Sequence, residues 1–519
     1  MPKRSRVWVC AAVVVCALTM MTPLAWSQAQ AEKNAEAAAD KAAKVAITDP
    51  AARAAAGQSA KAVARARIEL QACKLGEVEA RCGRYEVFED RAARKGRKIA
   101  LRVAVLPAAG PARAKSAIFF LAGGPGQAAT RLAGFAAEAM AGARAQREIV
   151  LVDQRGTGES NPLKCDVLGG NAQGTFTDLF PIERIRACRS ELESRANLRL
   201  YTTPIAMDDL DEVRAALGYE QVDLYGTSYG TRAAQVYLRQ YPKRVRSVIL
   251  KGVVPMEVVI PTTFARTTER ALELLLRDCA AAACAAAFPR LREELRVVTA
   301  RFEAGPVQVM PAGSRSSQQP VSITRGAFLM TLGLMLQSPP AAAQIPMIIH
   351  RAYENDYAPL AQVVQLVTRS LGSELYVGMM LSVVCAEDDP VADYAKALAE
   401  AKGTVLGDYR IEQQRAACAF WPRGKVPAGY RQSVSSTVPV LLISGNLDPV
   451  TPPESAEQAG QHFSNRLTVV AAGGSHSFSG MLGCVDRIMT EFVQTASPKG
   501  IEVSCAEKIK RPEFVVPRN

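Results

Sequence analysis

Residues 224–232 of the chain read Leu-Tyr-Gly-Thr-Ser-Tyr-Gly-Thr-Arg. Ser228 stands between Gly226 and Gly230, with an apolar, strand-like run before it and a helical pattern after it. A serine on such a sharp strand-to-helix turn holds its hydroxyl clear of the sheet, and glycines two positions away let strand and helix approach each other. The stretch therefore predicts a nucleophilic serine at the end of a buried strand.

A nucleophilic serine needs a base and a carboxylate, and after this kind of turn they follow in the order Ser, Asp or Glu, His. The sequence contains 3 histidines. His476 lies in a glycine-rich loop directly after the β-branched run 467–470, so it is the predicted base. His350 and His462 lie in helix-like stretches and are interpreted as packing or surface residues.

Asp448 is the predicted carboxylate. Residues 438–445 form an apolar run that does not alternate, which is typical of a buried parallel strand, and Asp448 lies in the loop leaving it. An aspartate before a proline is also a common turn residue. The strand, the loop and the chain order nevertheless agree with catalysis, and the long separation from Ser228 leaves room for an inserted lid.

Two further loops follow predicted strands. The loop Ala-Gly-Gly-Pro-Gly at 122–126 can turn backbone N–H groups toward a developing oxyanion. We expect the amides of Gly124 and of Tyr229, the residue after the nucleophile, to form this oxyanion hole. At the end of the next strand we expect Asp153 and Arg155 to form a buried ion pair that holds neighbouring loops.

Three motifs together resemble the prolyl aminopeptidase and tripeptidyl aminopeptidase branch of the α/β hydrolases: Gly-Gly-Pro-Gly at 123–126, Asp-Gln-Arg-Gly-x-Gly at 153–158 and the serine motif at 225–232. The secreted, tripeptidyl aminopeptidase-like form is the more similar, over residues 70 to 510. The resemblance implies an α/β-hydrolase fold, with a mostly parallel sheet, helices on both faces and an inserted helical cap. The chain departs from the family pattern at two positions.

The two departures are Ala122, where many relatives have a histidine, and Lys251, where many have an acidic residue. Ala122 belongs to the oxyanion loop, so its identity can alter rate or substrate. Lys251 lies at the end of the strand that is predicted after the serine motif, and it is none of the predicted catalytic residues.

The sequence also divides into regions by its patterns. Strand and helix signals alternate over 67–255, which predicts the first part of the core. Helical signals dominate 256–435, as expected for the cap, and the core resumes over 436–519. Residues 28–66 are alanine-rich without a strand signal and are expected to form a linker or a loose helix.

Residues 1–27 are interpreted as a cleavable secretory signal peptide, since Lys3, Arg4 and Arg6 precede an apolar run. We therefore expect a periplasmic or extracellular protein without stable membrane insertion. Its 10 remaining cysteines are an even number in an oxidising compartment, which predicts disulfides. The residues alone do not fix which cysteines pair. Pairing of near neighbours closes the shortest loops, and it is the layout that the resemblance implies. The pairs it gives are Cys73–Cys82, Cys165–Cys188, Cys279–Cys284, Cys385–Cys418 and Cys484–Cys505.

The net charge of +13 falls to +10 without the three charges of the leader. A basic balance can indicate nucleic-acid binding. However, the densest basic cluster, 91–98, lies between two strand-like runs where a solvated turn is expected, so no nucleic-acid partner is predicted. The sequence has no C-x-x-C and no histidine beside a cysteine, so we expect no metal, and no cofactor is predicted either.

Glu387 is the predicted substrate-binding residue of the cap. It lies in Cys-Ala-Glu-Asp-Asp at 385–389, where three carboxylates gather in a basic protein. A carboxylate in a partly dehydrated pocket can hold a free α-ammonium, and the resemblance implies acidic cap residues in this role. The alternative is a solvated acidic turn before Pro390.

The predicted function is a secreted serine exopeptidase that takes peptides with a free N-terminus and releases amino acids or short peptides. Ser228 would attack the carbonyl, His476 would transfer the proton and Asp448 would orient the imidazole. One alternative is an esterase for small hydrophobic acyl esters, because the same machinery cleaves esters and the fold does not fix the substrate. The other is a non-catalytic, peptide-binding envelope protein that retains only the fold.

Overall fold

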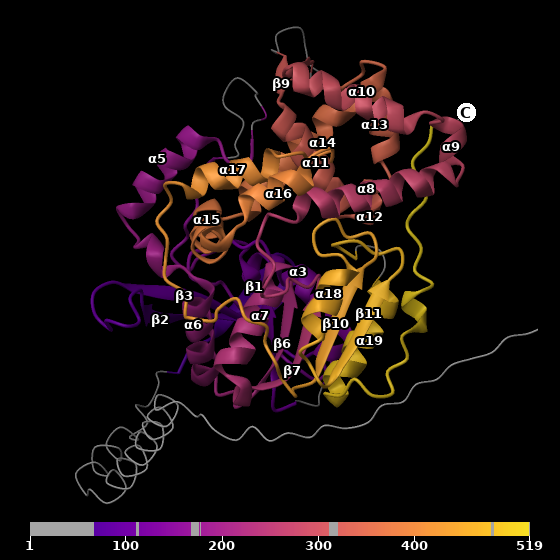
Figure 1. Cartoon of the computed structure of the whole chain (residues 1–519). Coiled ribbons are helices and arrows are strands. Elements are labelled where there is room, and N and C mark those ends of the chain that lie inside the picture. Colours follow the sequence, from indigo (N-terminus) through magenta and orange to yellow (C-terminus); the bar gives the residue numbers. More distant parts are fainter. Residues whose placement is uncertain are drawn as a thin grey trace, which may run out of the picture. The chain divides into compact units, whose positions relative to one another are not determined.

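A nine-stranded sheet organises the part of the chain that the computed structural model describes, which is residues 67–110, 114–167, 176, 178–310, 320–478 and 482–517. Its strand order is β1-β2-β3-β5-β4-β6-β7-β10-β11 (Figure 1). The strands are β1 (Gln71–Leu75), β2 (Val78–Phe88), β3 (Lys98–Leu106), β4 (Ala117–Leu121), β5 (Ile149–Val152), β6 (Val222–Thr227), β7 (Val245–Lys251), β10 (Val440–Gly445) and β11 (Arg466–Ala471).

The sheet is mixed, with a parallel majority as the sequence predicts. β5, β4, β6, β7, β10 and β11 pair in parallel, whereas β1, β2, β3 and β5 pair antiparallel. Only residues 76 and 77 separate β1 from β2, and Gly76 has a φ of 59°. A connection this short can join only antiparallel strands.

Helices cover both faces of the sheet because successive side chains of each strand point to opposite sides. Phe119 of β4 belongs to the apolar cluster that includes residues of α6 (Thr203–Ala216), α7 (Tyr229–Gln240) and α18 (Pro453–Gly460). Its neighbours Ile118 and Phe120 belong to the cluster on the other face, with residues of α3 (Ala133–Ala139), α4 (Ala141–Arg144) and α19 (Leu482–Thr495). The predicted α/β-hydrolase architecture, with helices on both faces, is confirmed.

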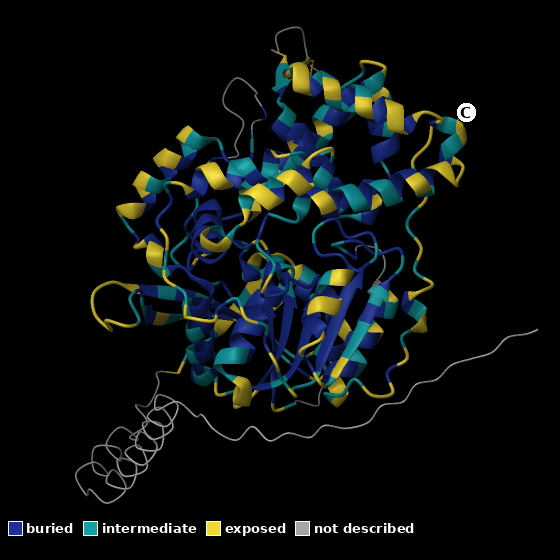
Figure 2. Cartoon of the chain, viewed as in Figure 1, coloured by how far each residue is buried: buried dark blue, intermediate teal, exposed yellow. Residues whose placement is uncertain are grey.

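A helical segment is inserted between β7 and β10, as predicted, and it lies beyond one edge of the sheet (Figure 1). Most of its helices share an apolar core of their own, while their outer faces are exposed (Figure 2). The helices are α8 (Phe264–Ala280), α9 (Cys284–Ala287), α10 (Leu291–Ala304), α11 (Arg325–Leu336), α12 (Pro339–Ala342), α13 (Ile345–Tyr353), α14 (Ala358–Glu374), α15 (Val377–Glu387), α16 (Tyr394–Ala401) and α17 (Tyr409–Cys418).

The remaining elements connect these layers. α15 packs into the apolar cluster of the sheet rather than into that of the other cap helices. A small hairpin of β8 (Val307–Val309) and β9 (Val321–Ile323) completes the inserted segment. The shorter connecting elements are α5 (Ile182–Glu193), η1 (Ala129–Leu132), η2 (Leu198–Leu200), η3 (Pro242–Arg244), η4 (Asp389–Val391) and η5 (Ser504–Ala506).

Five disulfides join the ten cysteines of the described residues, in the pairing that the resemblance implied. The bond between Cys385 and Cys418 ties the ends of α15 and α17 together. Among the described residues no helix combines the length and apolarity needed to cross a bilayer. The predicted leader and linker, at 1–27 and 28–66, lie outside the described residues.

Candidate active site

Ser228 occupies a strained turn between β6 and α7. Its backbone has φ 56° and ψ −127°, a region that residues with a side chain rarely adopt. The turn is held by the Ser228 N–H, which donates to the carbonyl of Lys251 at 2.9 Å. The Ser228 carbonyl accepts from the Thr231 hydroxyl at 2.6 Å and from the Thr231 N–H at 2.9 Å. The backbone therefore fixes where the serine side chain begins.

The two glycines of the motif are required by close backbone approaches. A Cβ on Gly226 would lie 2.4 Å from the carbonyl oxygen of Gly230. A Cβ on Gly230 would lie 2.1 Å from the carbonyl oxygen of Leu121, at the end of the neighbouring strand β4. Both contacts are shorter than any real Cβ contact, so the sequence places glycine where strand and helix come together.

His476 and Asp448 form a hydrogen-bonded pair across two neighbouring loops. The distance from His476 Nδ1 to Asp448 Oδ2 is 2.8 Å, and the Asp448 side chain is fully buried. Asp448 also accepts bonds from the N–H groups of Val450 and Thr451 and from the Thr451 hydroxyl. Burial alone would raise the pKa of Asp448, but His476 and these donors outweigh it and hold the pKa below its ordinary value.

The loop of His476 is anchored on both sides. The hydroxyl of Ser475 donates to the carbonyl oxygen of Leu336, in the cap, at 2.7 Å and lies 3.1 Å from the carbonyl oxygen of Leu447, beside Asp448. The imidazole itself packs against the end of β7, where a Cβ on Gly252 would lie 3.3 Å from His476 Cε1. The core and the cap thus both set the position of the imidazole.

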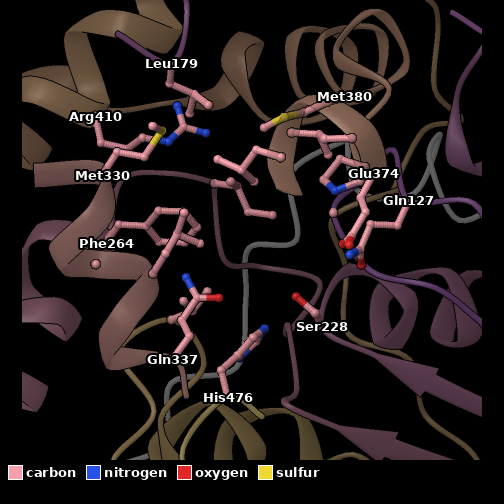
Figure 3. Close-up of a pocket in the computed structure, with 18 of the residues that line it drawn as sticks. Gln127, Leu179, Ser228, Phe264, Met330, Gln337, Glu374, Met380, Arg410 and His476 are labelled. Carbon is pink, nitrogen blue, oxygen red and sulfur yellow. The ribbon is translucent and has the colours of Figure 1, made fainter. Parts of the chain in front are cut away.

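Ser228 and His476 face one cavity of about 460 Å³ (Figure 3). Core loops form its floor and cap helices form its walls, and most of the lining is apolar. Cavities of this size hold small ligands or a few residues of a peptide. The residues from the cap that line it include Phe264, Leu329, Met330, Leu334, Gln337, Leu371, Glu374, Met380 and Arg410.

The predicted oxyanion residues lie beside the serine. Tyr229 is the first residue of α7, and an N–H in this position has no partner within the helix. A Cβ on Gly123 would lie 3.1 Å from the Cβ of Ser228, so the loop of Gly124 packs directly against the nucleophile. Gly124, Ser228 and Tyr229 also border a smaller adjoining cavity of about 30 Å³. Their role in holding an oxyanion stays a prediction.

Glu387 does not line the cavity. It is 2% exposed, and its carboxylate accepts bonds from the N–H and hydroxyl of Thr203 and from the hydroxyl of Tyr430. Burial raises its pKa to about 7, against the opposing effect of these donors. Its position does not support direct contact with a substrate ammonium, because its oxygens face structural donors.

Asp388, the next residue, joins the helix behind the nucleophile to the cap. Its carboxylate accepts from Arg232 of α7 at 3.0 Å, from Arg431 at 2.9 Å and from the N–H of Ile260 at 3.1 Å. Glu387 and Asp388 are therefore buried and bonded to donors of the protein rather than part of a solvated turn. Arg232 belongs to the serine motif, so its presence was visible in the sequence and its partner was not.

The predicted ion pair between Asp153 and Arg155 is wrong. Arg155 instead makes two hydrogen bonds to Asp209 of α6, at 2.6 and 2.9 Å. The chain turns sharply after β5 and wraps around Asp153, which accepts from the N–H and hydroxyl of Thr130 at 2.9 Å. This turn points the two side chains toward different elements.

Several cavity residues were not predicted as site residues. Gln127, Glu374 and Arg410 line the cavity although no local motif marks them. Lys251 also lines it, and the sequence did mark this position as a departure from the family pattern. Burial lowers the pKa of Lys251 to about 8. These residues come from separate elements, so only the assembled fold brings them together.

The other two histidines lie elsewhere. His350 Nδ1 is 3.0 Å from Glu294 Oε2 within the cap, and its ring contacts that of Phe288 at 5.2 Å between centroids. His462 is exposed at the end of α18. Both positions agree with the packing and surface roles that the sequence indicated.

Comparison with known proteins agrees with this geometry. Residues 117–296 match the family described as alpha/beta hydrolase fold. With the observed sheet, this match shows that the chain is an α/β hydrolase. Residues 403–505 match the family described as TAP-like protein, so this part of the chain is similar to the branch that the sequence motifs resemble.

Two named peptidases are similar to part of this chain. The serine protease Hip1 of Mycobacterium tuberculosis is 25% identical over 320 residues, which are 56% of this chain and 59% of that protein. The tripeptidyl aminopeptidase of Streptomyces coelicolor is 30% identical over 226 residues, 40% of this chain and 41% of that protein. The chain thus matches less than two thirds of the length of either relative.

Proposed function

We propose that the protein is a secreted serine peptidase that releases amino acids or short peptides from free N-termini. One observation carries the proposal. Ser228, on its strained turn, and His476, bonded to Asp448, face a cavity that also holds a carboxylate, Glu374. The peptidase relatives add support, and a substrate with a cationic end suits such a cavity.

The chemistry would follow the usual steps of acyl transfer. Ser228 attacks the peptide carbonyl while His476 takes its proton through Nε2 and later gives that proton to the leaving amine. Asp448 holds Nδ1 of the imidazole, which leaves Nε2 to take the proton. The amides of Gly124 and Tyr229 stabilise the oxyanion. Water then attacks the ester carbonyl of the acyl-enzyme, with His476 again taking the proton, and the released acyl group leaves as a carboxylic acid.

Glu374 takes the place that the sequence assigned to Glu387. Gln127, which directly follows the oxyanion loop, forms an isolated β-bridge with Leu375, and Glu374 lies beside Gln127 in the wall of the cavity (Figure 3). Among the described residues that line the cavity, Glu374 supplies the only carboxylate. A carboxylate in this position attracts an α-ammonium.

Secretion is part of the proposal. Disulfides persist in oxidising compartments, and the described residues hold five of them. The predicted leader at 1–27 agrees with export to the periplasm or the medium.

Matched pairs of substrates test the function. The parent protein should cleave aminoacyl- or tripeptidyl-arylamides with a free N-terminus at least about 10-fold faster than their N-acetylated forms, because acetylation removes the ammonium. Ser228→Ala should abolish cleavage of both. Glu374→Gln should lower the ratio of the cleavage rates of free and acetylated substrates. Glu303→Gln, at an exposed position of α10, should leave this ratio unchanged.

Other outcomes identify the alternatives. Equal rates on free and acetylated substrates, together with faster cleavage of small acyl esters, would favour the esterase. A folded protein whose Ser228 is not labelled by a fluorophosphonate would favour the non-catalytic binding protein.

A further inference from the structure

Arg410 places a guanidinium in the wall of the cavity without a carboxylate partner. It is the second residue of α17, and its guanidinium carbon lies 5.0 Å from the ring centre of Phe180 and 5.9 Å from that of Phe264. Its Nη1 is buried and has no hydrogen-bond partner. No carboxylate of the described residues forms an ion pair with it.

Arg410 is half-buried in the cap, and two fully buried arginines of the core differ from it in their pairing. Arg155 makes two bonds to Asp209, and Arg232 makes two bonds to Asp388. A buried cation without a partner is costly, so proteins normally pair such groups. The Arg410 guanidinium instead lies over two aromatic rings, and none of the described residues supplies a carboxylate for it.

Arg410 remains a cation under working conditions. Burial lowers its pKa to about 10, since the only opposing groups are the hydroxyls of Tyr409 and Tyr394. At neutral pH the guanidinium is therefore almost fully protonated. It faces a cavity with an apolar lining, where a charge-assisted hydrogen bond is stronger than in water.

We propose that Arg410 binds a carboxylate of the substrate inside the cavity. Figure 3 shows Arg410 across the cavity from Ser228, and on another wall than Glu374. A substrate with its ammonium at Glu374 and its scissile carbonyl at Ser228 would direct an acidic group of its bound part toward Arg410. The planar guanidinium can bind a carboxylate through two parallel hydrogen bonds.

The carboxylate can have two sources. It can be the side chain of an aspartate or glutamate in the part of the substrate that is transferred to Ser228. It can also be the terminal carboxylate of a very short peptide. The assignment to peptides rests on the proposed function, whereas the binding of a carboxylate by Arg410 can be measured without turnover.

Cleavage of matched arylamides tests the side-chain source. The parent protein should prefer Ala-Ala-Glu-arylamide to Ala-Ala-Gln-arylamide, and Glu-arylamide to Gln-arylamide. In Arg410→Gln the ratio of kcat/KM for acid over amide should fall by about 10- to 100-fold, the usual effect of losing a charged hydrogen bond. Arg410→Lys should retain part of the ratio. Arg415→Gln, which removes a charge from an exposed position on the same helix, should leave the ratio unchanged.

Protection of Ser228 from a fluorophosphonate tests binding directly. Three peptides carry the side-chain carboxylate alone (Ala-Ala-Glu-amide), the terminal carboxylate alone (Ala-Ala-Gln) or neither (Ala-Ala-Gln-amide). At least one of the two peptides with a carboxylate should protect Ser228 of the parent protein from labelling at about 10-fold lower concentration than the neutral peptide does. Arg410→Lys should weaken this protection.

The outcomes separate the two proposals. Equal protection by all three peptides of a parent protein that labels normally would overturn the role of Arg410, as would an unchanged acid-to-amide ratio in Arg410→Gln. If a carboxylate is needed to protect Ser228 but no peptide is cleaved, the proposed function is contradicted and the carboxylate site is retained. If Arg410→Gln does not fold, the protection of Ser228 in the parent protein and in Arg410→Lys still tests whether Arg410 binds a carboxylate.

Discussion

Replacing Lys251 with methionine should stabilise the protein at neutral pH. Lys251 is 3% exposed at the end of β7, and its ammonium lies 5.2 Å from the ring centre of Phe135 and 4.4 Å from that of Phe478. Burial lowers its pKa from 10.5 to about 8, although Asp448 and Asp486 oppose the shift. Methionine has a similar length and carries no charge to desolvate.

The magnitude follows from the shift in pKa. A fall from 10.5 to about 8 corresponds to a folding cost of roughly 3 kcal/mol. Because the folded pKa is the lower one, the unfolded chain binds more protons between these two pH values, so stability rises with pH across that window and the full cost applies below it. The variant also loses two cation–π contacts of about 0.5 to 1 kcal/mol each. The net gain at pH 7 should be about 1 to 2 kcal/mol.

Urea unfolding with the disulfides intact measures this gain. The midpoint of Lys251→Met should exceed that of the parent at pH 7, and the difference should shrink as the pH approaches 10. Lys402→Met, an exposed position after α16, should match the parent at both pH values. A variant less stable than the parent at pH 7, or a difference independent of pH, would refute the reasoning.

Three further substitutions have defined outcomes. Asp448→Asn should lower kcat/KM on free-N-terminus arylamides by about 10⁴-fold, the scale known for other serine triads, and a loss below tenfold would contradict its orienting role. Asp388→Ala leaves Arg232 buried without its partner and should lower the free energy of unfolding in urea by about 3 to 5 kcal/mol; an unchanged midpoint would show that the ion pair is dispensable. Cys385→Ser with Cys418→Ser opens a link between positions 33 residues apart and should cost about 3 to 4 kcal/mol, read in the same way. That double variant should still be labelled by a fluorophosphonate, because none of the hydrogen bonds that hold the serine turn involves this disulfide.

Features that depend on the local backbone could be predicted from the sequence at the catalytic serine. Gly226 and Gly230 could be interpreted without a structure because only glycine tolerates approaches of 2.4 and 2.1 Å at Cβ. Apolar runs predicted the central strands, and the chain order after Ser228 led to Asp448 and His476, which the structure places 2.8 Å apart. These predictions need only the loops that follow the parallel strands. The carboxyl ends of parallel strands lie at the same end of the sheet, so these loops gather there.

The pairing of side chains across separate elements depends on the assembled fold. The sequence paired Arg155 with its neighbour Asp153, whereas the fold brings Asp209 of α6 to it. Likewise the acidic cluster suggested Glu387 for the cavity, but α15 turns that residue toward Thr203, and Glu374 of α14 faces the cavity instead. Which face a cap helix turns inward depends on contacts with helices far along the chain, and no local pattern encodes those contacts. Arg410 stands out for the same reason, since an absent partner is visible only when all neighbours are in place.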